Sequence, residues 1–220
     1  MSYRLFIFDL DGTLVDTSPG IMATVRYVEQ TMGIPPIPEE QLRRFIGPPL
    51  EPSFMRYHKA TQEQARAMVA CYRERYGVTG VGEAAVYPGI PEILDAIDAA
   101  GAVSAVATLK HYTMAEKSLA RFGLTHRFAA TAMGQDSHPS KAQLIRQVMA
   151  ELRWEDPRTA VMIGDSRYDG EGALEAGVDF VPLTYGFGFA DPGSLDGLPT
   201  VFTAHTPQEL VEFVQTSLRT

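Results

Sequence analysis

Along this chain, short apolar runs alternate with stretches that have helical spacing. The first run, residues 5–8, is apolar at every position, which predicts a strand covered on both faces. Four later apolar runs predict further strands, at 103–107, 128–132, 160–163 and 180–183. The alternation of these strands with helices predicts an α/β fold with a doubly wound, Rossmann-like sheet of parallel strands.

One long segment near the start of the chain departs from this alternation. No strand candidate appears between Val15 and Gly80. Thr17 or Ser18 can cap a first helix in this segment. Further helical patterns follow at 39–46, 50–58 and 61–76. We therefore expect an all-helical insert, residues 16–82, placed within an α/β core that consists of residues 1–15 and 83–220.

Composition and charge exclude several classes of function. The chain has 220 residues, 45% of them hydrophobic, and a formal net charge of -8. This charge argues against nonspecific binding to nucleic acid or to anionic membrane, because no block of Lys and Arg offsets it. The first four residues run directly into the first strand, and no apolar stretch approaches membrane-spanning length, so we expect a cytoplasmic protein. Either a monomer or a homodimer is compatible with the sequence.

The most informative chemistry follows the first predicted strand. Side chains on extended backbone alternate in direction, so Asp9, Asp11 and Thr13 can project from one side. Two carboxylates in one small space repel each other unless a cation lies between them or one of them holds a proton. Gly12 allows the chain to turn closely around whatever is bound.

This acidic stretch has two simpler interpretations. Asp-Gly is a frequent turn dipeptide, so the acids could belong to an ordinary turn after a strand. A calcium loop of EF-hand type is excluded by spacing. Such a loop needs Gly at position six and Glu at position twelve, but counting from Asp9 these positions hold Leu14 and Gly20.

Other polar residues stand at or after the ends of later strands. Thr108 ends one apolar run, Asp165 ends another with Asp169 four residues later, and Lys141 begins a helix. Each has a structural alternative: a threonine that favours strands, a solvated lysine, or acids that cap a helix. In open α/β sheets, however, ligands bind outside the carboxyl ends of the strands. Together these groups suit one phosphate and one metal ion.

The ordered segments Asp9-Leu10-Asp11-Gly12-Thr13, Thr108, Lys141 and Gly164-Asp165-Ser166-Arg167-Tyr168-Asp169 resemble the four motifs of the haloacid dehalogenase (HAD) superfamily. The helical insert directly after the first motif resembles the type C1 cap of that superfamily. Residues 87–90 and 45–50 are similar to its phosphoglycolate phosphatase-like branch. The resemblance extends over nearly the whole chain.

The resemblance implies a catalytic role for each motif residue. Asp9 would attack phosphorus and form an aspartyl-phosphate. Asp11 would protonate the leaving oxygen and later activate water, which requires that it hold a proton at the start. Thr108 and Lys141 would hold the transferring oxygens. The expected enzyme is a phosphatase that acts on a small phosphorylated metabolite.

The resemblance also implies a magnesium ion. Its ligands would be Asp9, Asp165 and the backbone carbonyl of Asp11, so that an anionic nucleophile can approach an anionic phosphate. Asp169 would support the metal shell or orient Lys141 rather than bind the ion directly.

Residue 11 distinguishes between the reactions of the family. The dehalogenases of the superfamily lack an acid two residues after the nucleophile, so Asp11 favours phosphate ester chemistry. Leu109, after Thr108, departs from the family pattern, in which a small polar residue is usual. We expect this departure to bear on the substrate more than on the reaction class.

Substrate contacts are expected from the core and from the cap. In the core they would be Gly12, Leu109 and Lys110, the last of which could meet a substrate carboxylate. In the cap, Arg44 and the loop at Gly47 are the best candidates among the basic helices. A phosphoglycolate-like acid and a nucleoside monophosphate fit these residues equally well.

Three other functions remain open at this point. A β-phosphoglucomutase-like phosphomutase would use the same acid pair, although the loop 47–51 has no arginine to grip a second phosphate. A receiver-like signalling module also combines acids, Thr and Lys, but it has no place for the helical insert. A metal-binding scaffold without turnover is the third.

Overall fold

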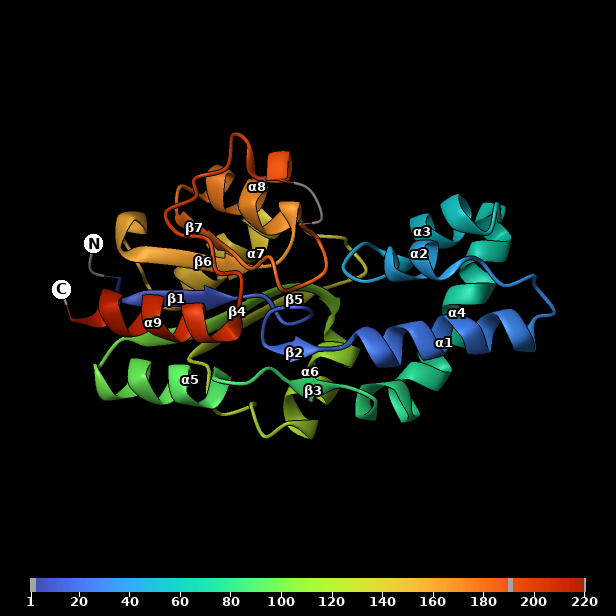
Figure 1. The fold of residues 1–220 in the computed structure, drawn as a ribbon, viewed down its shortest axis with the longest axis horizontal. Coiled ribbons are helices and arrows are strands. Elements are labelled where there is room, and N and C mark those ends of the chain that lie inside the picture. Colours follow the sequence, from blue (N-terminus) through green and yellow to red (C-terminus); the bar gives the residue numbers. More distant parts are fainter. Residues whose placement is uncertain (1–2, 190–191, 220) are drawn as a thin grey trace. The chain divides into compact units, whose positions relative to one another are not determined.

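The computed structural model describes residues 3–189 and 192–219, and these form two compact units. The core unit comprises Met1–Val15 and Val86–Thr220, and the helical unit comprises Asp16–Ala85. Sequence places the boundaries of the insert at residues 16 and 82. In Figure 1 the helical unit is the blue-to-teal part of the chain, from α1 to α4.

The core unit is built on a five-stranded sheet in the order β5-β4-β1-β6-β7. All four strand pairings in it are parallel, which confirms the predicted fold class. The first strand is central, so the chain departs to both sides of it. The strands are β1 (Leu5–Phe8), β4 (Val103–His111), β5 (Ala130–Gly134), β6 (Ala160–Gly164) and β7 (Asp179–Pro182).

Four strands differ from the sequence-based bounds. Strand β6 ends one residue later than predicted, and β7 lies one residue earlier. Strand β4 continues four residues past the predicted end at 107, and β5 begins two residues after the predicted start at 128. At the carboxyl end of the sheet β5 also extends two residues past its predicted end at 132, to Gly134, and β4 and β5 pair irregularly between Thr108 and His111. The strand that carries Thr108 therefore extends through Lys110.

Helices cover both faces of this sheet (Figure 1). One layer contains α7 and α8, which pack against each other and against the strands. Another contains α5 and α9, which also pack together. The helices of the core unit are α5 (Ile90–Ala99), α6 (Tyr112–Arg121), α7 (Lys141–Glu151), α8 (Arg167–Ala176) and α9 (Pro207–Leu218).

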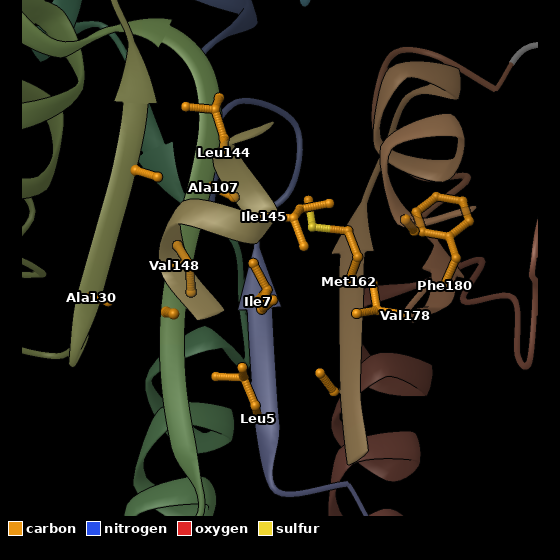
Figure 2. Close-up of a cluster of buried hydrophobic side chains, with 14 residues drawn as sticks. Leu5, Ile7, Ala107, Ala130, Leu144, Ile145, Val148, Met162, Val178 and Phe180 are labelled. Carbon is orange, nitrogen blue, oxygen red and sulfur yellow. The ribbon is translucent and has the colours of Figure 1, made fainter. Parts of the chain in front are cut away.

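A buried apolar cluster fixes α7 over the central strand. Figure 2 shows Leu144, Ile145 and Val148 of α7 lying over Ile7 of β1 and Ala107 of β4. Successive side chains of β1 alternate between the two faces of the sheet. The position after Phe8 therefore belongs to the α7 face, and the first residue of α7 lies near the carboxyl ends of the strands.

The helical unit contains four α-helices and one 3-10 turn among its described residues. They are α1 (Ser18–Thr31), α2 (Glu39–Arg43), α3 (Leu50–Tyr57), α4 (Gln62–Val78) and η1 (Gly80–Gly82). Helix α4 begins at a capping box, in which Thr61 and Gln64 satisfy each other's backbone N–H groups. Helix α2 ends at Arg43, three residues before the predicted end, and turns follow it.

Two very short strands pair at the junction of the units: β2 (Val15–Asp16) and β3 (Ala85–Val86). The sequence did not predict them, because two residues are too few to give a detectable alternation. Within the described part of the chain, we find no helix with the length and apolarity needed to cross a membrane.

Candidate active site

Asp9 stands immediately after β1 and is buried. Its backbone N–H donates to the carbonyl of Ile163 on β6 at 2.9 Å, so the main chain remains held by the neighbouring strand. An apolar strand that stops at an acid thus delivers one carboxylate to the carboxyl end of the sheet, at its centre.

Lys141 reaches the same point from the first turn of α7. Its Nζ lies 2.9 Å from Asp9 Oδ1, 2.7 Å from Asp169 Oδ1 and 2.8 Å from the carbonyl oxygen of Ala107. The ammonium donates hydrogen bonds to Asp9 and Ala107 and forms an ion pair with Asp169. Burial favours the neutral amine, but Asp169 and Asp9 outweigh it and raise the pKa of Lys141, which keeps it charged.

Helices α7 and α8 pack closely, and a glycine of α8 leaves space for the side chain of Lys141. At Gly172 of α8, an added Cβ would lie 2.6 Å from Cγ of Lys141. Any other residue at this position would therefore displace the lysine stem. Ser140 caps α7 in a capping box with Gln143, which fixes where the helix begins.

Asp165 follows β6 and is held from a loop that comes later in the chain. The backbone N–H of Phe187 donates to Asp165 Oδ2 at 2.6 Å, and Gly188 donates to its carbonyl at 3.1 Å. Burial raises the pKa of Asp165 well above its usual value, with further contributions from the charges of Asp169 and Asp9.

Asp169 both caps a helix and pairs with Lys141, two roles that the sequence offered as alternatives. Its Oδ2 accepts hydrogen bonds from the backbone N–H and the hydroxyl of Ser166, at 3.0 and 2.6 Å, as the third residue of a capping box at the start of α8. Its Oδ1 pairs with Lys141. A helix cap therefore also orients the lysine that contacts Asp9.

The acids fit a divalent cation. Oxygen atoms of Asp9, Asp165 and Asp169 lie within 4.8 Å of one another, and all three residues are buried. Carboxylates this close repel strongly in a low dielectric, and a hard cation bound by oxygen ligands relieves that repulsion. After burial, the charges of Asp169 and Asp9 are the next contributions to the raised pKa of Asp165. The donor set suits magnesium, which is bound through one or two carboxylates together with substrate phosphate oxygens.

Three predicted core residues have distinct positions. Thr108 is buried, and its Oγ1 accepts a hydrogen bond from the backbone N–H of Lys110 at 3.2 Å. Leu109 packs against the apolar cluster under α7, so its side chain points away from the position of Lys110. Gly12 has a φ of +76°, and an added Cβ would lie 2.2 Å from Asp165 Oδ2.

Lys110 and Asp11 form an ion pair that sequence did not predict. Lys110 Nζ lies 2.8 Å from Oδ1 and 3.0 Å from Oδ2 of Asp11, so it contacts both carboxylate oxygens. Both side chains are largely buried. The pair joins the turn after β1 to the end of β4, which are 99 positions apart in the sequence.

The two predicted cap residues belong to the helical unit. Arg44 follows α2 and is exposed. Gly47, three residues later, has a φ of +97° and open space where a Cβ would be. Both therefore lie on accessible backbone of their own unit.

Comparison with known proteins identifies the family. Residues 6–183 match the model of the haloacid dehalogenase-like hydrolase family. The chain belongs to this family. It is 35% identical to a 5'-nucleotidase of Pseudomonas aeruginosa, over 87% of each chain. It is 28% identical to a phosphoglycolate phosphatase of Mesorhizobium japonicum, over 100% of this chain and 98% of the relative.

Solved structures extend the comparison. The Mycobacterium tuberculosis protein tyrosine kinase A superposes with a TM-score of 0.82 at 31% identity, over 97% of this chain and 98% of that one. The chain is a HAD-type phosphatase of the phosphoglycolate phosphatase-like branch. This assignment rests on the family match and on the relatives named 5'-nucleotidase and phosphoglycolate phosphatase. The chain is therefore an enzyme of the phosphoric monoester hydrolase class.

Sequence reasoning missed two contacts of this site, that of Lys110 with Asp11 and that of Phe187 with Asp165. The Phe187 N–H that holds Asp165 comes from a backbone group, which carries no residue signature. The helix cap, by contrast, is an alternative that the sequence offers, because a serine followed by an acid three residues later at a helix start is a capping-box pattern.

Proposed function

We propose that this protein is a magnesium-dependent phosphatase that hydrolyses a small phosphate monoester through an aspartyl-phosphate intermediate. The observation that carries the proposal is the buried group of Asp9, Asp165, Asp169 and Lys141 at the carboxyl end of the central strands. The cluster contains three carboxylates and only one lysine to offset their charge. Such a cluster suits the binding of a cation and a phosphoryl group.

Asp9 is the nucleophile in this proposal. Its oxygen attacks phosphorus as the bond to the leaving oxygen breaks, and water later cleaves the resulting acyl phosphate. Lys141 contacts Asp9 Oδ1 and so directs the other oxygen toward substrate. Magnesium bound by Asp9, Asp165 and the Asp11 carbonyl would neutralise charge on the transferring phosphoryl group.

Asp11 supplies the proton transfers. In the first step it donates a proton to the leaving oxygen, and in the second it accepts one from the attacking water. Thr108, buried at the end of β4, supplies a hydroxyl for a phosphoryl oxygen. Asp169 acts through Lys141, which it holds by the ion pair.

The proposed substrates are a phosphoglycolate-like acid or a nucleoside monophosphate. The relatives include a protein named 5'-nucleotidase and one named phosphoglycolate phosphatase. The helical unit is proposed as the cap that selects between such substrates, with Arg44 and Gly47 as its contact residues. The motif residues handle only the phosphoryl group and leave this choice open.

Phosphate release from a panel of monoesters tests the proposal, with magnesium and with chelator. The panel contains phosphoglycolate, nucleoside monophosphates and p-nitrophenyl phosphate. Asp9→Asn should lower kcat by about 10⁴-fold or more, because the amide is not a nucleophile. Chelator should abolish turnover, and readdition of magnesium should restore it.

Asp95, an exposed residue that pairs with Arg127, offers the matched control. Asp95→Asn makes the same chemical change at a solvent-exposed carboxylate outside the cluster. This variant should retain wild-type turnover. Unchanged activity of Asp9→Asn, or full turnover in chelator, would refute the mechanism. Phosphoryl transfer to a sugar phosphate faster than to water would instead indicate a phosphomutase.

A further inference from the structure

The contact between Lys110 and Asp11 has no role in the reaction described so far. It joins the acid of the first motif to a residue of β4 by two short distances, 2.8 and 3.0 Å, one to each carboxylate oxygen. The Lys110 side chain is 8% exposed and that of Asp11 is 14% exposed. At this burial the pair is shielded from solvent and is not an ordinary surface salt bridge.

The backbone of β4 delivers Lys110 to this position. Its N–H donates to the hydroxyl of Thr108, and the pairing with β5 shifts register just beyond. Gly134 at the end of β5 allows the irregularity, because a Cβ there would lie 2.3 Å from the carbonyl oxygen of Leu109. Two neighbouring strands therefore fix the main chain from which the lysine extends.

Asp11 is fixed independently from its own side. The backbone N–H groups of Leu14 and Val15 both donate to the carbonyl of Leu10, and Gly12 donates to the carbonyl of Val15. These bonds close a tight turn around Asp11. The carboxylate therefore retains mainly the freedom of its own side-chain torsions, and Lys110 restricts those.

Such a pair is a poor device for stability. Removing a lysine and a carboxylate from water costs about as much as their attraction returns, so a buried ion pair is weak evidence of a stabilising role. An acid that must transfer a proton within hydrogen-bond reach, by contrast, gains directly from a fixed orientation.

We propose that Lys110 is a positioning residue, which holds the Asp11 carboxylate in the orientation needed for proton transfer in both steps of phosphate ester hydrolysis. This inference rests on the proposed function. The proton itself passes from Asp11 to the leaving oxygen, and later from water to Asp11. Lys110 neither gives nor takes it, and acts only through the carboxylate it contacts.

Leaving groups of different basicity test this role. An alkyl phosphate needs a proton on its leaving oxygen, whereas p-nitrophenyl phosphate does not. Lys110→Met should therefore lower kcat for the alkyl ester by about 100-fold. With p-nitrophenyl phosphate the first step should be spared and the second slowed, which gives a burst of nitrophenolate equal to the enzyme concentration.

Two further variants serve as a rescue and a control for this result. Lys110→Arg, which can also contact both carboxylate oxygens, should recover most of the lost turnover of the alkyl ester. Lys117→Met, an exposed lysine on α6, is the matched control and should behave as wild type. Thermal melts of each variant separate lost folding from lost positioning, and Lys110→Gln repeats the test if the Met variant does not fold.

A double-mutant cycle with Asp11→Asn gives the decisive measurement. If Lys110 acts only through Asp11, Lys110→Met should cost less than about threefold in kcat when Asp11 is already replaced. An undiminished 100-fold loss in that background would show that Lys110 contacts substrate directly and would overturn the inference. Wild-type kcat in Lys110→Met would overturn it as well, whereas a wild-type enzyme that hydrolyses no monoester would refute the proposed function.

Discussion

Two buried acids of this protein, Glu29 in the helical unit and Asp165 in the core unit, have opposite surroundings. Glu29 accepts hydrogen bonds from the backbone N–H of Ile37 and from Arg26, and its Oε1 lies 2.9 Å from His58 Nε2. The Asp165 carboxylate accepts a hydrogen bond from the backbone N–H of Phe187 and lies beside two other carboxylates.

The pKa values of the two acids move in opposite directions. Burial acts to raise the pKa of Glu29, but the Ile37 N–H, Arg26 and His58 outweigh it, so the net pKa is lowered. Burial raises the pKa of Asp165 too, and its acidic neighbours raise it further. A buried acid with its donors supplied is part of the structure, whereas one left crowded by like charges marks a site that binds something positive.

Asp165→Asn should give the largest effect and should separate activity from stability. We expect kcat with magnesium to fall by about 10³-fold, because the proposed ion loses a charged ligand. In chelator, the same change should raise the free energy of unfolding by about 1–2 kcal/mol, because it removes one of three repelling carboxylates. Phosphate release and urea unfolding measure the two effects.

Magnesium binding supplies a readout of this variant that does not depend on turnover. An ion at a hundredfold excess over its Kd stabilises the protein that binds it by about 2–3 kcal/mol. The wild-type Tm should therefore rise with magnesium, and the Tm of Asp165→Asn should not. Equal magnesium shifts in the two proteins would contradict the assignment of Asp165 as a ligand.

Glu29→Gln should show the reverse behaviour. The change leaves Arg26 and the buried His58 without their charged partner, which should lower the free energy of unfolding by about 3 kcal/mol. The exposed pair Glu39–Arg43 provides the control, because Glu39→Gln should cost less than about 0.5 kcal/mol. Circular dichroism follows the helices of both units, and Trp154 fluorescence follows the core unit alone.

Acid should reproduce this effect in the wild-type protein. Because the folded-state pKa of Glu29 lies below its unfolded value, its stabilisation is complete above the unfolded pKa of about 4.3 and is lost as pH falls through the folded value. The stability gap between wild type and Glu29→Gln should therefore narrow from pH 6 to pH 3. A constant gap over that range would show that the charge of Glu29 is not what stabilises the network.

The contrast also explains what the sequence could predict. The sequence predicts the places of Asp9 and Asp165 because parallel strands end at one edge of a sheet, and each acid directly follows an apolar run. It predicts the places of Lys141 and Asp169 because each lies in the first turn of a helix. For each of these residues, local pattern and topology together determine the position.

The Lys110–Asp11 contact was beyond this reasoning. Sequence placed Lys110 near substrate, but its direction depends on an irregular register between β4 and β5 that leaves no mark in the hydrophobic pattern. The network of Glu29 was equally hidden, because it joins α1 to a loop at Ile37 and to His58, which lies 29 positions later. Contacts between distant segments require the folded geometry, whereas strand ends do not.

Substitutions at two glycines, one in each unit, should give the smallest effects in the comparison of the helical unit with the core unit. Gly12 and Gly33 both have left-handed backbone, with φ of +76° and +65°. An added Cβ at Gly33, in the helical unit, meets nothing within 4 Å, so Gly33→Ala should cost only the backbone strain, about 1 kcal/mol. At Gly12 the same Cβ lies 2.2 Å from Asp165 Oδ2, the atom held by Phe187.

Gly12→Ala should therefore cost the same strain plus the displaced hydrogen bond, about 1–2 kcal/mol more than Gly33→Ala. It should also weaken the magnesium-induced rise in Tm, because Asp165 must move, whereas Gly33→Ala should leave that rise unchanged. Parallel urea unfolding and thermal melts of the two variants measure both differences. If the two substitutions cost the same and both keep the full magnesium shift, close packing of the first-motif turn against Asp165 does not constrain the metal site.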